Sequence, residues 1–146
     1  MKVSLTILFC LSGILLVSAQ VSVVVEVDEP TLIGCHWKPK TNQTCLYQSA
    51  SDENHYFFQF TNAEYARINE ITTVGFNATI DELELLYQSA VKVYDEGKTI
   101  ALRIGEHDLM IVKDKWLSFH FSKQGEINSY FIVNKKQLEN LFGKRK

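Results

Sequence analysis

The most regular pattern in the chain is a helical repeat of apolar residues near its middle. Apolar side chains recur there every three or four residues, at Ile80, Leu83, Leu86, Tyr87, Ala90, Val91 and Tyr94. This spacing predicts an amphipathic helix that buries one face. Thr79 and Glu82 have the spacing of a capping box at its start, and Gly97 is suited to its end. We therefore predict a helix over residues 80–96.

Shorter segments before this helix are rich in β-branched and aromatic residues, a composition typical of strands. We predict four strands there, over residues 21–27, 32–38, 44–48 and 56–60. Thr61 and Glu64 repeat the capping-box spacing, so a short helix over residues 62–69 is predicted to follow the fourth strand.

The region after Gly97 predicts four more strands and a final helix. The strands are expected over residues 99–104, 109–113, 116–122 and 127–133, with polar or glycine-containing turns between them. Asn134 and Gln137 form a variant of the capping box before a helix over residues 135–142, which Gly143 would end. The predicted fold class is α+β, with antiparallel β meanders of about eight strands, one long amphipathic helix and a short C-terminal helix.

Both halves can be written as four strands followed by a helix. The strand that starts at Tyr56 and precedes a predicted helix also resembles the strand around Tyr130, which precedes the last helix. Two interpretations stay open. Either the chain contains a true internal repeat of two ββββα halves, or two unrelated meanders each end in a capped helix.

The N-terminal residues have the pattern of an export signal. Lys2 gives a positive start, residues 5–17 are mostly apolar, and Ser18 and Ala19 place small residues at the cleavage point. The apolar run is shorter than the roughly 20 residues that span a bilayer as a helix. We therefore predict a signal peptide over residues 1–19 and a single secreted, extracellular globular domain over residues 20–146, without a membrane anchor.

The composition supports one folded domain with a protein or a small molecule as its partner. Hydrophobic residues make up 46% of the chain and only two residues are proline, which indicates a packed core rather than a disordered linker. The formal net charge is −2, and removal of Lys2 makes it one unit more negative. A mildly acidic surface does not attract phosphates, so nucleic acid is an unfavourable partner.

Two cysteines remain after the signal peptide is removed together with Cys10. Cys35 and Cys45 allow only one intramolecular pairing, and an oxidising compartment favours this disulfide. Closing the loop would stabilise the fold by roughly 2 to 3 kcal/mol. The alternative, a metal site that includes His36, needs more ligands than the neighbouring sequence offers.

Two Asn-x-Thr triplets predict N-glycosylation. Asn42 lies in the loop that the disulfide would close, and Asn77 lies just before the long helix. Thr79 would belong both to the second triplet and to the helix cap. These two roles are compatible, because the sugar is attached to the asparagine.

No motif for catalysis or metal binding stands out. The four histidines, His36, His55, His107 and His120, lack the spacing at which neighbouring side chains share a metal ion. Ser118 and His120 share one face of a predicted strand, but no Gly-x-Ser-x-Gly motif accompanies them. We therefore predict no metal, no cofactor and no enzymatic activity.

The outward face of that strand is the best candidate for a binding surface. The alternation of a strand places Trp116, Ser118 and His120 opposite its apolar residues, and Arg103 is likewise out of phase with the apolar residues of a neighbouring strand. Exposed Trp and Arg are typical anchors of protein interfaces, so Arg103, Trp116 and His120 are predicted to form a mixed patch. The alternative is that Trp116 is buried under a loop or helix.

The C-terminal half resembles the ββββα modules of the Whirly and positive-cofactor group of single-strand nucleic-acid binders. Residues 98–142 carry the resemblance, with a hairpin at Gly105, a strand from Trp116, a Lys-Gln-Gly-Glu turn at residues 123–126 and a closing helix. Members of that group bind through basic, aromatic-bearing sheet faces inside cells. This chain is acidic and has an export signal, so the resemblance implies a similar fold and leaves nucleic-acid binding as an alternative function.

Together these features predict a secreted, N-glycosylated, non-enzymatic protein that binds an extracellular or cell-surface protein, as salivary, venom, reproductive and immune effectors do. An alternative is an extracellular carrier that encloses a small apolar ligand between the sheet and the helix over residues 80–96. The segment that contains Gly143, Lys144 and Arg145 also leaves two interpretations open, a processing signal or a helix C-cap followed by cations near the negative end of the helix dipole.

Overall fold

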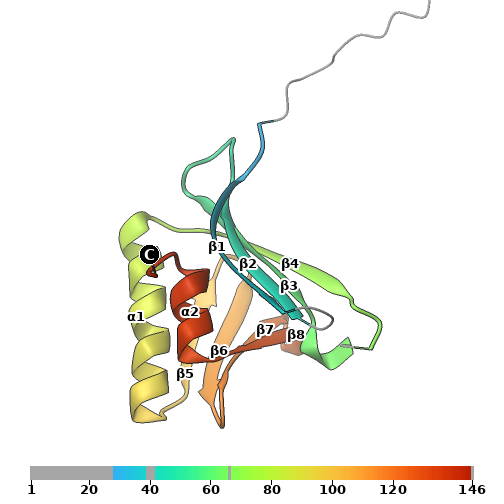
Figure 1. Ribbon diagram of the computed structural model, residues 1–146, viewed down its shortest axis with the longest axis vertical. Coiled ribbons are helices and arrows are strands. Elements are labelled where there is room, and N and C mark those ends of the chain that lie inside the picture. The colour runs from blue at the N-terminus through green and yellow to red at the C-terminus, as the bar shows by residue number, and fades with distance from the viewer. Residues whose placement is uncertain (1–27, 39–41, 66, 146) are drawn as a thin grey trace, which may run out of the picture.

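Two antiparallel four-stranded sheets and two α-helices make up the described part of the protein (Figure 1). The computed structural model describes residues 28–38, 42–65 and 67–145. In sequence order, sheet A has β1 (Thr31–Lys38), β2 (Asn42–Gln48), β3 (His55–Thr61) and β4 (Ile71–Asn77), and sheet B has β5 (Ile100–Ile104), β6 (His107–Lys113), β7 (Leu117–Lys123) and β8 (Glu126–Val133). Helix α1 (Ile80–Glu96) connects the sheets, α2 (Lys135–Leu141) follows β8, and a 3₁₀ turn, η1 (Ala63–Tyr65), lies between β3 and β4. The predicted α+β class, with antiparallel meanders, one long helix and a short C-terminal helix, is confirmed.

The connection between β3 and β4 differs from the prediction. A short helix is predicted directly after β3, but the structure has only η1 there, followed by the unpredicted strand β4. Thr61 does not cap a helix, because its hydroxyl accepts a hydrogen bond from the backbone N–H of Gln43 in the neighbouring strand. The backbone N–H of Asn62 donates to the carbonyl of Glu70 and closes the loop. The β-branched start of β4 then favours an extended strand.

The two halves share one plan, four antiparallel strands followed by a helix. Thr79 caps α1 and Asn134 caps α2, and in both helices the third residue completes a capping box. The structural counterpart of β8 is β4, because both lead into a capped helix, whereas the sequence similarity around Tyr56 matches β8 with β3. The predicted signal peptide and the predicted strand over residues 21–27 lie outside the described residues.

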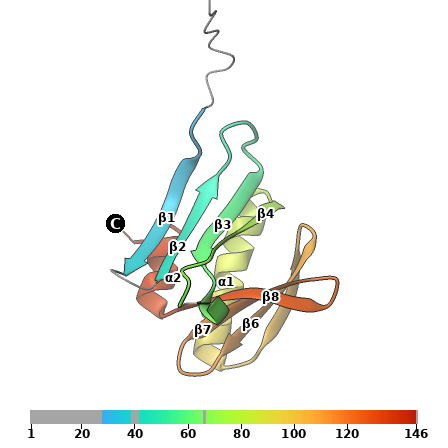
Figure 2. The same ribbon diagram turned by 90° about the vertical axis from the view of Figure 1, so that its right-hand side faces the viewer.

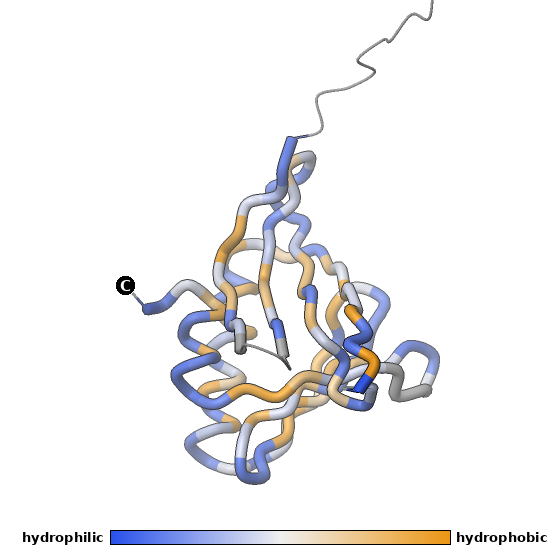
Figure 3. The backbone as a smooth tube through the Cα atoms, turned by 45° about the vertical axis from the view of Figure 1, so that its right-hand side comes forward, coloured by the Kyte–Doolittle hydropathy of each residue, from blue (hydrophilic) through white to orange (hydrophobic). Residues whose placement is uncertain are grey.

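The inner faces of both sheets and the two helices contribute to one aromatic core. Figure 2 shows the strands of sheet B crossing those of sheet A, and Figure 3 shows hydrophobic and hydrophilic positions alternating along the strands. Phe58 is fully buried in this core. Its ring centroid lies 5.4 Å from that of Phe76 in sheet A, 5.7 Å from that of Phe131 in sheet B and 6.2 Å from that of Phe142 after α2. Neither sheet therefore has an apolar interior of its own.

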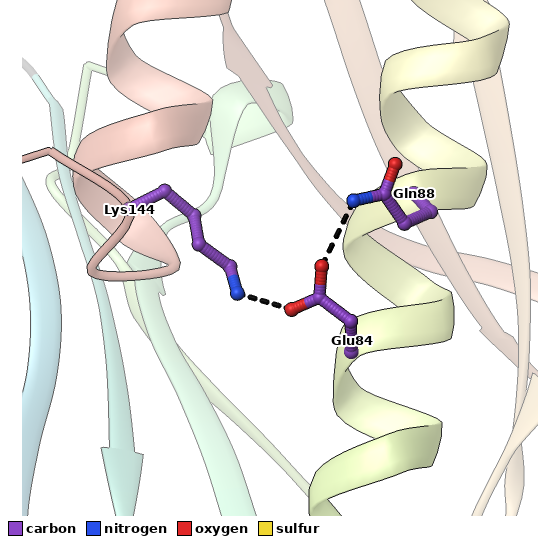
Figure 4. Close-up of polar contacts among 3 residues, drawn as sticks. All are labelled: Glu84, Gln88 and Lys144. Atoms are coloured by element: carbon purple, nitrogen blue, oxygen red, sulfur yellow. Dashed lines mark hydrogen bonds and ion pairs between the residues drawn. The ribbon is translucent and has the colours of Figure 1, made fainter.

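The two helices lie side by side on the same side of the sheets (Figure 1). Close packing of α2 on β1 requires Gly34, because a Cβ atom there would lie 2.0 Å from the carbonyl oxygen of Asn140. Lys144, beyond α2, reaches α1 and forms an ion pair with Glu84, and Gln88 donates to the other oxygen of the same carboxylate (Figure 4). These two donors lower the pKa of Glu84.

Candidate binding surface

The side of sheet B opposite the core carries two of the three side chains that were predicted to bind a partner, Arg103 and His120. Along β7, every second residue from Leu117 to Phe121 is buried, and the residues between them, Ser118 and His120, face outward. The strand registers place one outward residue of each strand in a row: Ala101, Met110, His120 and Tyr130. We use the name outer face of sheet B for this row and its outward neighbours Arg103, Asp108, Ser118 and Ile132.

His120 is held in place by contacts on this face. Its ring stacks on Tyr130 with the centroids 4.9 Å apart, and its Nε2 atom lies 3.0 Å from the hydroxyl oxygen of Ser118. Partial burial lowers the pKa of His120 below its ordinary value. This shift favours the neutral form of the ring, so the contribution of this part of the face is mainly aromatic.

Ser118 and His120 are within hydrogen-bond distance of each other, and the Ser118 hydroxyl also lies 3.4 Å from the carbonyl oxygen of Val112. A nucleophile and base pair also needs a third group that orients the base. Within the described residues, no side chain is hydrogen-bonded to the other ring nitrogen of His120. In the described parts of the chain, no three His, Cys, Asp or Glu side chains are placed to hold a metal ion. A non-enzymatic function stays a prediction.

Arg103 and Trp116 lie at opposite ends of sheet B. Through the pairing of β5 with β6 and of β6 with β7, Arg103 is level with Ser122, six residues along the chain from Trp116. At about 3.3 Å per residue this separation is roughly 20 Å. His120 lies between them, so the three predicted residues do not form one cluster. Trp116 is 44% exposed in the turn before β7, so it is not buried under a loop or helix.

The charged side chains near this face are paired. Arg103 Nη1 lies 3.3 Å from Asp108 Oδ1. At the adjoining turns, Lys123 Nζ lies 2.6 Å from Glu106 Oε2, and this contact lowers the pKa of Glu106. The outer face of sheet B is therefore nearly neutral rather than basic.

Three large side chains of the outer face were missed by the analysis of the sequence. They are Met110, Tyr130 and Ile132, of which Met110 and Ile132 are 38% and 42% exposed. The available signal for Met110 was the length of the turn at Gly105. With two residues in this turn, rather than the longer turn predicted, the register of β6 on β5 follows directly. The register of β8 on β7 does not follow from its turn, because it shifts between Phe121 and Ser122 and so places Tyr130 opposite His120.

Cys35 and Cys45 form the predicted disulfide. They are direct partners in the pairing of β1 with β2, so the bond links the edge strand of sheet A to its neighbour. Of the two candidate glycosylation sites, Asn42 is the first residue of β2. Asn77 is the last residue of β4, is exposed, and has its side-chain oxygen 2.7 Å from Nδ1 of His55. Glycosylation of either asparagine stays a prediction.

A cleft with a volume of about 200 Å³ lies between α1, β5 and the end of β4. Its apolar lining comes from Phe76, Ala78, Leu85, Leu86, Leu102 and Ile104. Asn77, Glu82 and Arg103 are among its polar lining residues. This is the region between sheet and helix in which a carrier was predicted to enclose its ligand, but the volume is below the roughly 300 to 1,000 Å³ typical of sites for drug-sized molecules.

Comparison of the chain with models of protein families, with curated proteins and with solved structures finds no match. The resemblance of residues 98–142 to the Whirly and positive-cofactor group therefore stays a prediction. Within the described ranges, no helix has the length and apolar character needed to cross a membrane.

Proposed function

We propose that this chain is a secreted protein that binds an extracellular or cell-surface protein through the outer face of sheet B. The pattern of residues 1–19 supports export, and the disulfide between Cys35 and Cys45 suits an oxidising compartment. One observation carries the proposal. A row of apolar and aromatic side chains crosses the side of sheet B that faces away from the core.

The side chains of this row have the composition of the centre of a protein interface. Met110, His120 and Tyr130 are direct cross-strand neighbours, and Ile132 extends the row along β8. Aromatic residues and methionine are enriched in interface cores, where a few buried side chains contribute most of the binding free energy. Because paired strands hold these residues in position, little conformational entropy is lost when a partner binds.

The position of the predicted sugars favours sheet B over sheet A as the binding surface. Asn42 lies in β2 and Asn77 in β4, so both acceptors belong to sheet A. No Asn-x-Ser or Asn-x-Thr triplet occurs in the strands of sheet B. A partner that approaches the outer face of sheet B would therefore meet side chains rather than a glycan.

The charges of the outer face favour a protein partner over nucleic acid. Arg103 is paired with Asp108, and burial lowers the pKa of His120, which favours its neutral form. Nucleic-acid affinity depends on cations that displace counterions from phosphates, so it falls steeply with salt. A nearly neutral face offers little of this driving force.

The substitution Ile132→Glu tests the surface, with Ile71→Glu as a matched control. Both residues are exposed isoleucines on edge strands, one in each sheet. A partner cross-linked to the parent protein in extracellular fluid would be identified, purified and titrated. We expect Ile132→Glu to weaken its binding at least about tenfold and Ile71→Glu to leave it unchanged. Full affinity in both Ile132→Glu and Arg103→Ala would exclude the outer face, and full affinity in Trp116→Ala would exclude the binding role predicted for Trp116.

A carrier of a small apolar ligand is the second candidate, because the cleft between α1 and β5 has an apolar lining. Its volume of about 200 Å³ admits only a small molecule, which makes this function less well supported than protein binding. Native mass spectrometry of the secreted protein would test it. A carrier retains its ligand and shows the added mass, whereas the mass of the bare chain with its sugars would exclude a carrier.

A further inference from the structure

The outer edge of β5 is available for pairing with another strand. β5 is the terminal strand of sheet B and pairs with β6 on one side. On its other side, no strand of the described part of the chain continues the sheet. An edge of this kind presents backbone donors and acceptors that a further strand can use.

The turn after β5 determines which backbone groups face this edge. The turn contains two residues and begins at Gly105, whose φ of 57° suits the first central position of a type II′ hairpin turn. In such a hairpin the flanking residues Ile104 and His107 exchange both backbone hydrogen bonds, and every second residue of β5 is bonded to β6 in the same way. The N–H and C=O groups of Ala101 and Arg103 therefore point away from β6, and both residues are exposed.

One flank of α1 lies across the cleft from this edge. Glu82, Leu85 and Ser89 lie on one side of the helix at steps of three and four residues, and they line the cleft together with Leu102 and Ile104 of β5. Leu85 is 65% exposed although its side chain is apolar. A strand edge on one side and an apolar helix flank on the other thus border the same cleft.

We propose that an extended segment of the protein partner adds to sheet B along β5 as a fifth strand and places an apolar side chain in the cleft beside Leu85. This inference rests on the proposed protein-binding function and names its mode of recognition. An extended polypeptide offers donors and acceptors at the repeat that matches Ala101 and Arg103, and the side chains of an added strand give specificity through pockets at alternate positions.

The chemistry of the cleft favours a peptide over a small apolar molecule. An apolar ligand could fill the cleft, but it would leave the outward backbone groups of Ala101 and Arg103 unpaired. The edge is also continuous with the outer face of sheet B, because the side chain of Arg103 pairs with Asp108 on that face. A partner that covers the outer face is therefore in position to extend a segment along β5.

Random linear peptides displayed on phage provide the probe. They are selected against the full protein secreted from animal cells, so that any sugar on Asn77 is present. We expect the enriched peptides to share an alternating pattern with one large apolar residue. When a synthetic copy of the dominant peptide binds the isotope-labelled protein, the amide protons of Ala101 and Arg103 should exchange at least about tenfold more slowly, because they become hydrogen-bonded.

Leu85→Asp and Ala101→Pro are the test variants. Leu85→Asp places a charge in the cleft, and Ile80→Asp is its control, because Ile80 is an exposed apolar residue of α1 that does not line the cleft. Ala101→Pro removes an outward N–H and leaves the bonds to β6 in place, as proline on an edge strand does. Each test variant should weaken peptide binding at least about tenfold, and Ile80→Asp should not.

The outcomes separate this inference from the proposed function. Selection that enriches no peptide, or a peptide that binds Leu85→Asp and Ala101→Pro as well as the parent, would overturn strand addition. A peptide that is lost in Ile132→Glu and kept in Leu85→Asp would overturn it as well, while supporting the outer face as a binding surface. Loss of peptide binding in Leu85→Asp, together with full peptide binding in Ile132→Glu, would support the site at the β5 edge. This holds even if Ile132→Glu also binds the protein partner with full affinity, which would count against the outer face.

Discussion

The two halves of the protein share a ββββα plan but differ in how their third and fourth strands are joined. In the second half, Gln124 and Gly125 form a tight turn with positive φ values of 56° and 84°. In the first half, residues 62–70 make a longer connection that contains η1. The side-chain oxygen of Asn62 in this connection accepts a hydrogen bond from the backbone N–H of Tyr130 in β8, at 3.3 Å. The tight turn therefore only connects β7 with β8, whereas the longer loop also forms a hydrogen bond between the two halves.

The sheets also differ in what surrounds their outward aromatic pairs. Tyr47 stacks on Phe57 on sheet A, with centroids 5.1 Å apart, and His120 stacks on Tyr130 on sheet B. Sheet A carries both predicted sugar acceptors, one of which, Asn77, also lines the cleft beside β5. The outer face of sheet B carries its aromatic pair without such an acceptor. The two sheets have a similar arrangement of strands, but only the outward face of sheet B is free of predicted sugar acceptors.

The largest expected effect concerns the core that the halves share. Phe58→Ala removes a ring that contacts aromatic rings of both sheets, and we expect it to lower the free energy of unfolding by about 3 to 5 kcal/mol. Urea denaturation is followed by circular dichroism and by fluorescence. The only two tryptophans, Trp37 and Trp116, report on one half each, so their transitions should coincide. Separate transitions would show that the halves have independent cores.

The disulfide tests whether a constraint within one half stabilises both. Cys35→Ala combined with Cys45→Ala should lower the free energy of unfolding by about 2 to 3 kcal/mol, because the unfolded chain gains the freedom of an open loop. Trp116, in the other half, should report the same loss as Trp37 in the urea transition. A loss seen by Trp37 alone would mean that sheet A unfolds separately.

Loss of the hydrogen bond between Asn62 and Tyr130 should lower the stability less than the two preceding changes. Asn62 is buried, and Asn62→Ala leaves the backbone N–H of Tyr130 without this acceptor, so we expect a loss of about 1 to 3 kcal/mol. Glu70→Ala is the control, since Glu70 is an exposed partner of the same side chain. Faster hydrogen exchange of the Tyr130 amide in Asn62→Ala, and not in Glu70→Ala, would locate the effect. Equal exchange in both would contradict the role given to this bond.

The smallest expected effect is a pH dependence on the outer face of sheet B. Burial lowers the pKa of His120 from 6.5, so the unfolded chain binds this proton more readily than the folded protein. Stability should therefore fall as the pH decreases below about 6.5 and should level off below the folded pKa. The free energy of unfolding of His120→Phe should fall less than that of the parent between about pH 7.5 and pH 5, because the variant has no imidazole to protonate. A difference from the parent that stays constant over this range would refute the assignment.

Local patterns were sufficient for most of the fold. The helical repeat from Ile80 and the capping box at Thr79 predicted α1, and the same type of box at Asn134 predicted α2. The spacing of Thr61 and Glu64 looked equally local but was misleading. The hydroxyl of Thr61 bonds to Gln43 instead, and a partner 18 residues away is not part of any local pattern.

The candidate site was less accessible from the sequence than the fold. The outward position of His120 follows from alternation within one strand, which the sequence shows directly. Its neighbours Met110 and Tyr130 depend on the registers of three strands. These registers depend on the turn lengths and, between β7 and β8, on the register shift at Phe121 and Ser122, which no local pattern announces. The cleft beside Leu85 depends on the packing of β4, α1 and β5, and no single segment contains that information.

Thr79 has a consequence for variation in this protein. Its hydroxyl accepts from the backbone N–H of Glu82 at the start of α1, and the same threonine completes the Asn77 triplet. Serine is the one replacement that keeps both an oxygen for the helix and an acceptor triplet for the glycosylation enzyme. Asn or Asp at this position would keep the helix cap but lose the predicted acceptor triplet, whereas an apolar residue would lose both.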